Sequence, residues 1–217
     1  MNGIFVTGTD TDVGKTWVGT HLIRELIDRG IDVHPRKPIE SGWPTGDFQH
    51  TDAWRLALAA GKTEQLDAIC PNRFAAALSP VRAARMEGTS LTLRQLAAQC
   101  TENLKQDDFL YVEGAGGLYS PLTEDALNAD LASALRLPVV LVANNRLGCM
   151  SQVLLCCEAL QRRGLDLLAV VLNQVSDSSG DATMNNQEDL AELLPQPVFS
   201  LTHNQSSLPA PLIDLLY

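Results

Sequence analysis

The sequence predicts an α/β fold, with helices on both faces of a doubly wound, mostly parallel sheet. Short, continuous apolar runs are the first reason, because runs without polar alternation are typical of strands that are covered on both faces. These runs lie at residues 4–6, 109–112, 138–143 and 167–172, and weaker strands are predicted at 32–34 and 198–199. Amphipathic helical patterns between the runs are the second reason, since strands that alternate with helices favour parallel βαβ units.

The predicted helices follow the strands in order, and several end at a glycine or a proline. They lie at residues 15–29 before Gly30, from Asp52 onward, at 91–104, at 150–163 before Gly164, and at 187–194 before Pro195. The segments 42–46 and 177–186 are predicted to be loops, because glycine, proline and small polar residues accumulate there.

Length and composition limit the possible functions. The chain has 217 residues and no recognisable linker, so we expect one domain over residues 1–217. Its 16 Lys and Arg residues against 26 Asp and Glu residues give a net charge of −10, which argues against binding nucleic acid or anionic membranes. The sequence contains no apolar run of 18 residues, so no transmembrane helix is predicted. The odd number of five cysteines, without zinc-type spacing, indicates reduced thiols in a cytoplasmic protein.

The strongest motif lies between the first strand and the first helix. Gly8 is followed, after five residues, by Gly14-Lys15-Thr16, which is one residue longer than the usual spacing of a phosphate-binding loop. Glycines let backbone N–H groups converge on phosphate oxygens, and the helix N-terminus adds positive potential. The lysine can reach the terminal phosphates and the Thr16 hydroxyl can ligate Mg²⁺. We therefore expect a P-loop NTPase-like sheet that binds ATP or GTP.

Three further residues are candidates for the chemistry. Glu113 follows an apolar strand and precedes a glycine-rich turn, so it can reach the metal shell, or else it is a solvated loop carboxylate. Lys37 precedes Pro38, which favours an extended conformation, although a lysine in this position is more often solvated. Asp52 precedes a helix and, taken alone, fits the role of an N-terminal helix acid or cap.

Five segments together resemble dethiobiotin synthetase. They are VTGTDTDVGKT, KPIESG, TDAWRLA, VEGAGGLYSPL and LPVVLVANNRLGCMSQVLL, in order from about residue 4 to residue 174. The resemblance implies an ATP- and Mg²⁺-dependent cyclo-ligase of biotin biosynthesis that works as a homodimer. In that family 7,8-diaminononanoate and CO₂ (or bicarbonate) form a carbamate, which attacks the γ-phosphate of ATP. The second amine then closes the ureido ring.

The resemblance also implies roles for individual residues. The catalytic lysines are Lys15 and Lys37, and the Mg²⁺ ligands are Thr16, Asp52 and Glu113. The ATP-binding residues are Asp12, Val13, Gly14, Lys15, Thr16, Trp17, Asp52, Glu113, Gly114, Ala115, Gly116, Asn173, Gln174, Thr202, His203 and Asn204. The substrate-binding residues are Thr11, Ser41, Gly116, Gly117 and Cys149, the last of which fits a packed structural role equally well.

Two departures from the family pattern are visible. Arg146 stands where a lysine is common, and the charge is retained. The segment after the last strand lacks the usual proline, which affects the expected contacts of Thr202, His203 and Asn204 with the nucleotide base.

Two rival interpretations belong to other classes. An ATP-driven switch of the partition or iron-protein type usually has a lysine near the start of the loop, whereas Thr9 and Asp10 stand there. An amide-forming synthase of the cobalamin type usually carries a further glutamine-hydrolysing domain, for which 217 residues leave no room.

The helix at residues 150–163 suggests the homodimer independently. Its beginning, within the segment 147–155, is largely apolar and directly follows a strand end, where ligand loops of α/β sheets gather. A helix that is apolar nearly all round must bury a second face. We expect a partner chain to cover that face, although a central core helix would explain the pattern as well.

Overall fold

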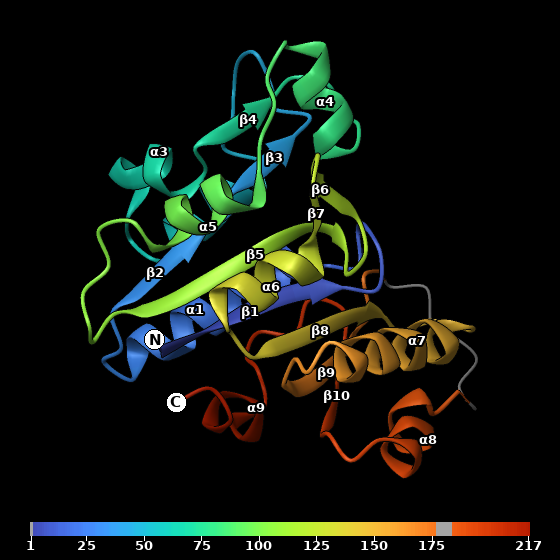
Figure 1. Cartoon of the computed structure of the whole chain (residues 1–217). Helices are drawn as coiled ribbons and strands as arrows, with labels where there is room; N and C mark the ends of the chain where they lie inside the picture. Colours follow the sequence, from blue (N-terminus) through green and yellow to red (C-terminus); the bar gives the residue numbers. More distant parts are fainter. Residues whose placement is uncertain (1, 177–183) are drawn as a thin grey trace.

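The structure is a computed structural model that describes residues 2–176 and 184–217. Six parallel strands form its central sheet, in the order β10-β9-β8-β1-β5-β2 (Figure 1). Their bounds are β1 Asn2–Gly8, β2 Val33–Arg36, β5 Phe109–Gly117, β8 Val139–Asn144, β9 Leu167–Asn173 and β10 Val198–Leu201. The predicted doubly wound α/β fold and all six of its strands are confirmed.

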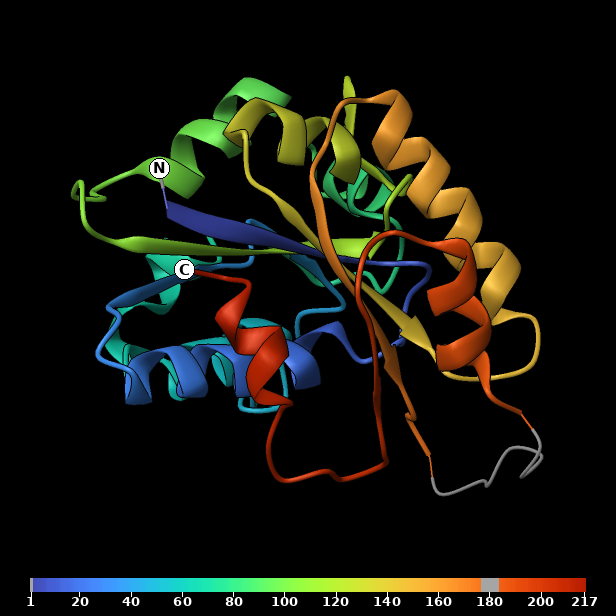
Figure 2. The same ribbon diagram turned by 90° about the horizontal axis from the view of Figure 1, so that it is seen from below.

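Helices cover both faces of this sheet, as Figure 2 shows from below, with α1 and α9 on one side and α5, α6 and α7 on the other. The helices are α1 Lys15–Asp28, α2 Asp52–Ala59, α3 Leu66–Ile69, α4 Pro80–Met86, α5 Leu93–Thr101, α6 Asn128–Leu135, α7 Cys149–Arg162, α8 Asn186–Leu193 and α9 Ala210–Asp214. The helices predicted at 15–29, 91–104, 150–163 and 187–194 are confirmed within one to three residues at each end.

Two small sheets accompany the central one. They are formed by β3 Ile39–Ser41 with β4 Asn72–Phe74, and by β6 Pro121–Thr123 with β7 Ala126–Leu127. The predicted loop at 42–46 has no regular structure, whereas most of the loop predicted at 177–186 lies outside the described residues. No helix in the described ranges is long and apolar enough to cross a bilayer.

The core consists of two apolar layers, one on each face of the sheet. Alternate side chains of β1 enter opposite layers, so that Ile4 and Val6 pack towards α1 while Phe5 packs towards α5 and α6. The strand order places β1 between β5 and β8, and the chain winds outward from β1 in both directions. In such sheets the loops that follow the central strands open a crevice at the carboxyl edge, where ligands bind.

Candidate functional site

The phosphate-binding loop fills the space between β1 and α1. Gly14 caps α1 with a φ of 89°, a conformation that favours glycine. A Cβ atom at this position would lie 2.0 Å from Nδ2 of Asn173, which itself donates to the carbonyl oxygen of Val13 at 3.1 Å. The end of β9 therefore fixes the path of the loop, and glycine is the residue that fits there.

Lys15 begins α1, and its ammonium group folds back onto the loop. Its Nζ atom donates to the carbonyl oxygen of Asp10 at 3.1 Å. Burial and the nearby charge of Lys37 lower the pKa of Lys15, against the opposing effect of Glu113 and other carboxylates. A desolvated ammonium beside a helix N-terminus is suited to bind phosphate oxygens.

A buried ion pair lies directly behind the loop. The Nζ atom of Lys37 is 2.6 Å from Oε1 of Glu113, 3.0 Å from Oδ2 of Asp52 and 3.3 Å from the carbonyl oxygen of Gly114. The Glu113 side chain is fully buried and that of Lys37 is 4% exposed. Sequence alone favoured a solvated role for this lysine, and the structure corrects that reading, because the lysine forms the centre of the charged cluster.

Two hydroxyl groups complete the surroundings of Glu113. The Thr16 hydroxyl donates to Oε1 at 2.8 Å, and the Tyr111 hydroxyl donates to Oε2 at 3.2 Å. Burial, followed by the nearby Glu113 charge, raises the pKa of Tyr111 well above its usual value, so that its hydroxyl stays protonated. Residues from α1 and β5 thus hold this carboxylate in one orientation.

The carboxylate of Asp52 is ionised by its neighbours. Burial alone would raise its pKa, but the charge of Lys37, together with the contacts that Thr16 and Lys37 make with the carboxylate, lowers it to about 2. Burial would likewise lower the pKa of Lys37, yet the surrounding carboxylates, led by Asp52 and Glu113, outweigh it and raise that pKa. Both groups are therefore charged at neutral pH.

These side chains open into a cavity of about 470 Å³ at the carboxyl edge of the sheet. Fifteen of the residues expected at the site line it: Thr11, Asp12, Gly14, Lys15, Thr16, Trp17, Lys37, Ser41, Asp52, Ala115, Gly116, Asn173, Gln174, His203 and Asn204. The segments come from distant parts of the chain, so the fold brings the predicted phosphate, metal, substrate and base residues to one place.

Other predicted residues lie outside the cavity wall. Val13, Glu113 and Gly114 stand behind it, in contact with the residues that line it. Gly117 is packed against the backbone of Thr9, where an added Cβ atom would lie 3.0 Å from the carbonyl oxygen. Thr202 is exposed and does not line the cavity.

Cys149 is the clearest departure from the predicted substrate contacts. Its side chain is fully buried at the start of α7, in an apolar cluster with Val153 and residues of β8 and β9. Of the two roles that its sequence position fits, the structure supports the packed one.

Five lining residues were missed at the sequence level: Ile39, Glu40, His50, Arg55 and Val175. Arg55 follows Asp52 by about one helical turn, so helix periodicity could have pointed to it. Glu40 directly precedes Ser41 in the segment KPIESG, but adjacent strand residues face opposite sides, so strand periodicity does not point to it. The other three carry no signal beyond their closeness to predicted residues.

The oxygen donors at this site fit a magnesium ion. The Thr16 hydroxyl, the Asp52 carboxylate and the Glu113 carboxylate converge within hydrogen-bonding distance of one another or of Lys37. Hard oxygen ligands of this kind, supplemented by substrate phosphates, are those that Mg²⁺ prefers.

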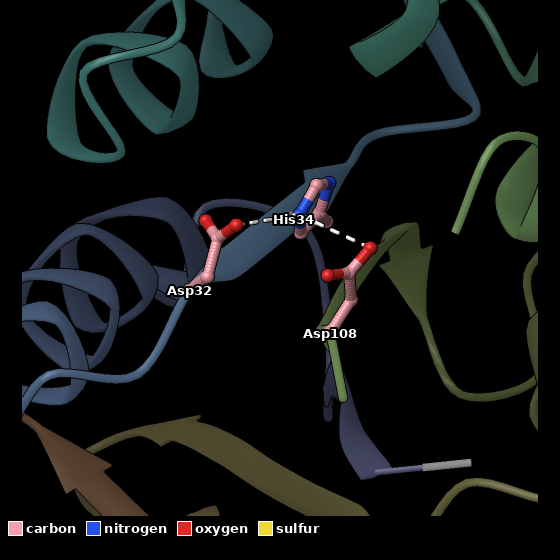
Figure 3. A group of neighbouring side chains, drawn as sticks. All are labelled: Asp32, His34 and Asp108. Atoms are coloured by element: carbon pink, nitrogen blue, oxygen red, sulfur yellow. Dashed lines mark hydrogen bonds and ion pairs between the residues drawn. The ribbon is translucent and has the colours of Figure 1, made fainter. Parts of the chain in front are cut away.

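A second group of possible metal ligands lies at the opposite edge of the sheet, where β2 and β5 begin (Figure 3). Nε2 of His34 is 3.2 Å from Asp32 and 3.4 Å from Asp108. The ammonium of Lys62 lies 2.6 Å from Asp32, and the backbone N–H of Lys105 donates to Asp108 at 2.7 Å. Asp32, His34 and Asp108 do not line the cavity, and their contacts join the beginnings of β2 and β5 to neighbouring segments, so we interpret the group as a polar network that ties the two strands together.

Comparison with known proteins agrees with this geometry. A family described as "AAA domain" matches residues 2–210. The ATP-dependent dethiobiotin synthetase BioD of Anaeromyxobacter dehalogenans (strain 2CP-C) is 43% identical over 193 residues, which cover 89% of this chain and 86% of that protein. The protein of the same name from Anaeromyxobacter sp. (strain Fw109-5) is 41% identical and covers 94% and 91% of the two chains.

Solved structures share the fold at much lower identity. The signal recognition particle receptor FtsY from Elizabethkingia anophelis has a TM-score of 0.52 and 14% identity, over 99% of this chain and 65% of that one. The cell division ATPase MinD from Pyrococcus furiosus has a TM-score of 0.51 and 19% identity, over 90% and 81%. At these identities the likeness shows the fold alone. The identity to the synthetases over most of both chains shows more, namely that the chain belongs to the dethiobiotin synthetase family.

Proposed function

We propose that this ligase uses ATP and Mg²⁺ to close the ureido ring of dethiobiotin from 7,8-diaminononanoate and CO₂. The observation that carries the proposal is the convergence of Lys15, Lys37 and Asp52 at one cavity, with the carboxylate of Glu113 directly behind its wall, in a chain of this family. The relatives favour this activity over the ATP-driven switch, because the chain shares only its fold with the cell division ATPase MinD.

In the proposed reaction, one amine and CO₂ first form a carbamate with loss of a proton. A carbamate oxygen then attacks the γ-phosphorus of ATP, the bond to the bridging oxygen breaks, and ADP leaves. The second amine attacks the carbon of the resulting mixed anhydride and loses a proton. The ring closes as inorganic phosphate departs.

The chain's own contribution is to position the reactants and neutralise charge. A carbamate is a weak nucleophile and the γ-phosphate is heavily charged, so catalysis depends on orientation and fixed positive groups. Lys15 and Lys37 supply that charge from two sides of the charged cluster. Thr16, Asp52 and Glu113 would hold Mg²⁺, which when bound neutralises the phosphate oxygens.

The remaining lining residues fit the two ends of such a reaction. Ser41, Thr11 and Gly116 line the cavity, and we assign them to the carbamate and amines. Asn173, Gln174, His203 and Asn204 line the same cavity from the ends of β9 and β10, and we assign them to the nucleotide base.

An assay of ADP release tests this function. Purified protein with MgATP is measured with and without 7,8-diaminononanoate and with and without bicarbonate. We expect release to require both. ATP hydrolysis at an equal rate without the diamine would contradict the proposal and favour a switch protein.

The metal assignment has a separate test. Glu113→Gln keeps the shape of the side chain but removes its charge, so the Mg²⁺ concentration for half-maximal turnover should rise more than the KM for the diamine. An unchanged Mg²⁺ response in both Glu113→Gln and Asp52→Asn would refute the assignment.

We further propose that the protein is a homodimer with α7 at the interface. Leu147 is 86% exposed just before this helix and Leu155 is 67% exposed on it, while Met150 and Leu154 are half-buried. Large apolar side chains on one exposed surface indicate a protein contact. A two-fold interface would place each of them twice.

Light scattering after size-exclusion chromatography tests the dimer. We expect twice the chain mass for the wild type, and dissociation together with weaker substrate use for Met150→Asp. A wild-type mass near that of one chain at micromolar concentration, with full activity, would refute the dimer.

A further inference from the structure

Glu40 makes an unusual pair of contacts with the beginning of α2. It lies in β3, and its Oε1 atom accepts the backbone N–H of Asp52 at 2.8 Å while Oε2 accepts that of Ala53 at 2.9 Å. The hydroxyl of Thr51 accepts the next helix donor, the N–H of Trp54, at 3.3 Å. The first turn of a helix leaves such donors without partners inside the helix. Here a carboxylate on β3, outside the helix, accepts hydrogen bonds from two of them.

These contacts connect three charged residues in a closed arrangement. Lys37 and Glu40 are three residues apart on one segment, Lys37 holds the side chain of Asp52 at 3.0 Å, and Glu40 holds its backbone. Asp52 is thereby held at both its carboxylate and its backbone. Changing the Glu40 contacts would move the helix start, and with it the carboxylate that faces the cavity.

Glu40 adds a third acid beside Asp52 and Glu113, although Thr51 already caps α2 as a neutral residue. The charged acceptor makes stronger hydrogen bonds and complements the positive end of the helix.

We propose that Glu40 is a positioning residue, which holds the N-terminus of α2 so that Asp52 presents its carboxylate to a metal–nucleotide complex in the cavity. The inference rests on the proposed function in one respect, the assignment of Asp52 to Mg²⁺. Both Glu40 oxygens face backbone donors of α2, so its effect reaches the ligand through Asp52.

The test is a Mg²⁺ titration of ATP binding, measured without the diamine so that it does not depend on turnover. Glu40→Gln keeps the size of the side chain but replaces one acceptor oxygen with an amide donor. We expect the Mg²⁺ concentration for half-maximal binding to rise roughly tenfold, which corresponds to about 1.4 kcal/mol. Amide hydrogen exchange at Asp52 and Ala53 should also become faster.

Asp125→Asn is the matched control. Its carboxylate accepts the backbone N–H of Leu93 at 3.0 Å, at the start of α5, and it does not line the cavity. It therefore reports the general effect of weakening a helix cap. Thermal unfolding checks that each variant is folded, and Glu40→Ala, which brings no amide donor, replaces Glu40→Gln if that variant aggregates.

Three results would overturn the inference. They are a Mg²⁺ response of Glu40→Gln within twofold of the wild type, an equal change in Asp125→Asn, and an effect confined to the KM for the diamine, which would indicate direct substrate contact. If wild-type ADP release proves independent of the diamine, the proposed reaction fails, while the Mg²⁺ titration still decides the role of Glu40.

Discussion

Replacing Lys37 with methionine should destabilise the protein as well as inactivate it. Methionine has a similar length and no charge, so the change removes the ammonium from its position 2.6 Å from Glu113. Among the residues that the structure describes, the fully buried carboxylate would then keep the hydroxyl groups of Thr16 and Tyr111 as its side-chain donors. Breaking a buried ion pair in this way typically costs about 3–5 kcal/mol. For a chain of this size, each kcal/mol lowers the Tm by about 2–4 °C, so we expect a loss of roughly 6–20 °C.

The double variant Lys37→Met/Glu113→Gln identifies the cause. If the unpaired charge is responsible, neutralising Glu113 should restore part of the lost stability, and the two changes together should cost less than their sum. Urea and thermal unfolding without nucleotide measure the stabilities of the single and double variants.

An exposed ion pair provides the control. Arg162 and Glu158 pair on the surface of α7, with side chains 77% and 55% exposed. Arg162→Met should change the free energy of unfolding by less than about 0.5 kcal/mol. A Lys37→Met protein that melts within about 2 °C of the wild type, or a double variant less stable than the single one, would refute the reasoning.

Three further predictions concern the phosphate-binding loop, the packing around Gly19 and the stability of the protein at low pH. Lys15→Ala should abolish ADP release with an unchanged Tm, and near-normal turnover would contradict the phosphate-loop assignment. Gly19→Ala should destabilise the protein by about 1–3 kcal/mol in urea unfolding, because its Cβ atom would lie 1.9 Å from the Tyr111 hydroxyl; Gly46→Ala, with no atom within 4 Å, should be neutral. The pKa of Asp52 is lowered to about 2, so its stabilising effect is complete above its ordinary pKa and disappears as the pH falls. The stability difference between wild type and Asp52→Asn should therefore shrink between about pH 5 and pH 2.

Sequence predicted the central sheet well because its strands are buried on both faces. The four inner strands β1, β5, β8 and β9 appear as uninterrupted apolar runs, whereas the edge strands β2 and β10 gave only weaker signals at residues 32–34 and 198–199. The short excursion β3–β4 and the helix α6 were not predicted. They are brief segments whose structure depends on tertiary contacts, such as the asparagine amide of Asn128, which bonds the carbonyl oxygens of Ala115 and Gly117.

The candidate site was predictable where a motif fixes chemistry and distance along the chain. The phosphate-binding loop has that property. Glu113 was identified from the apolar run before it, although the structure places it inside β5 rather than after the strand. The partnership of Lys37 with Glu113 spans 76 residues and depends on β2 and β5 lying side by side. No local pattern reveals such a contact. Glu40 was missed for a related reason, since its partners are backbone groups and leave no trace in side-chain composition.

The buried lysine also affects how the protein meets its ligands. Three carboxylates gathered near one cavity would repel one another, but the ammonium of Lys37 supplies the opposite charge among them. Groups of the chain itself therefore hold the cluster together. Little ordering of these side chains remains to be done on binding, so the conformational entropy lost at that moment is small. The arrangement of charges around Lys37 is in this sense a form of preorganisation.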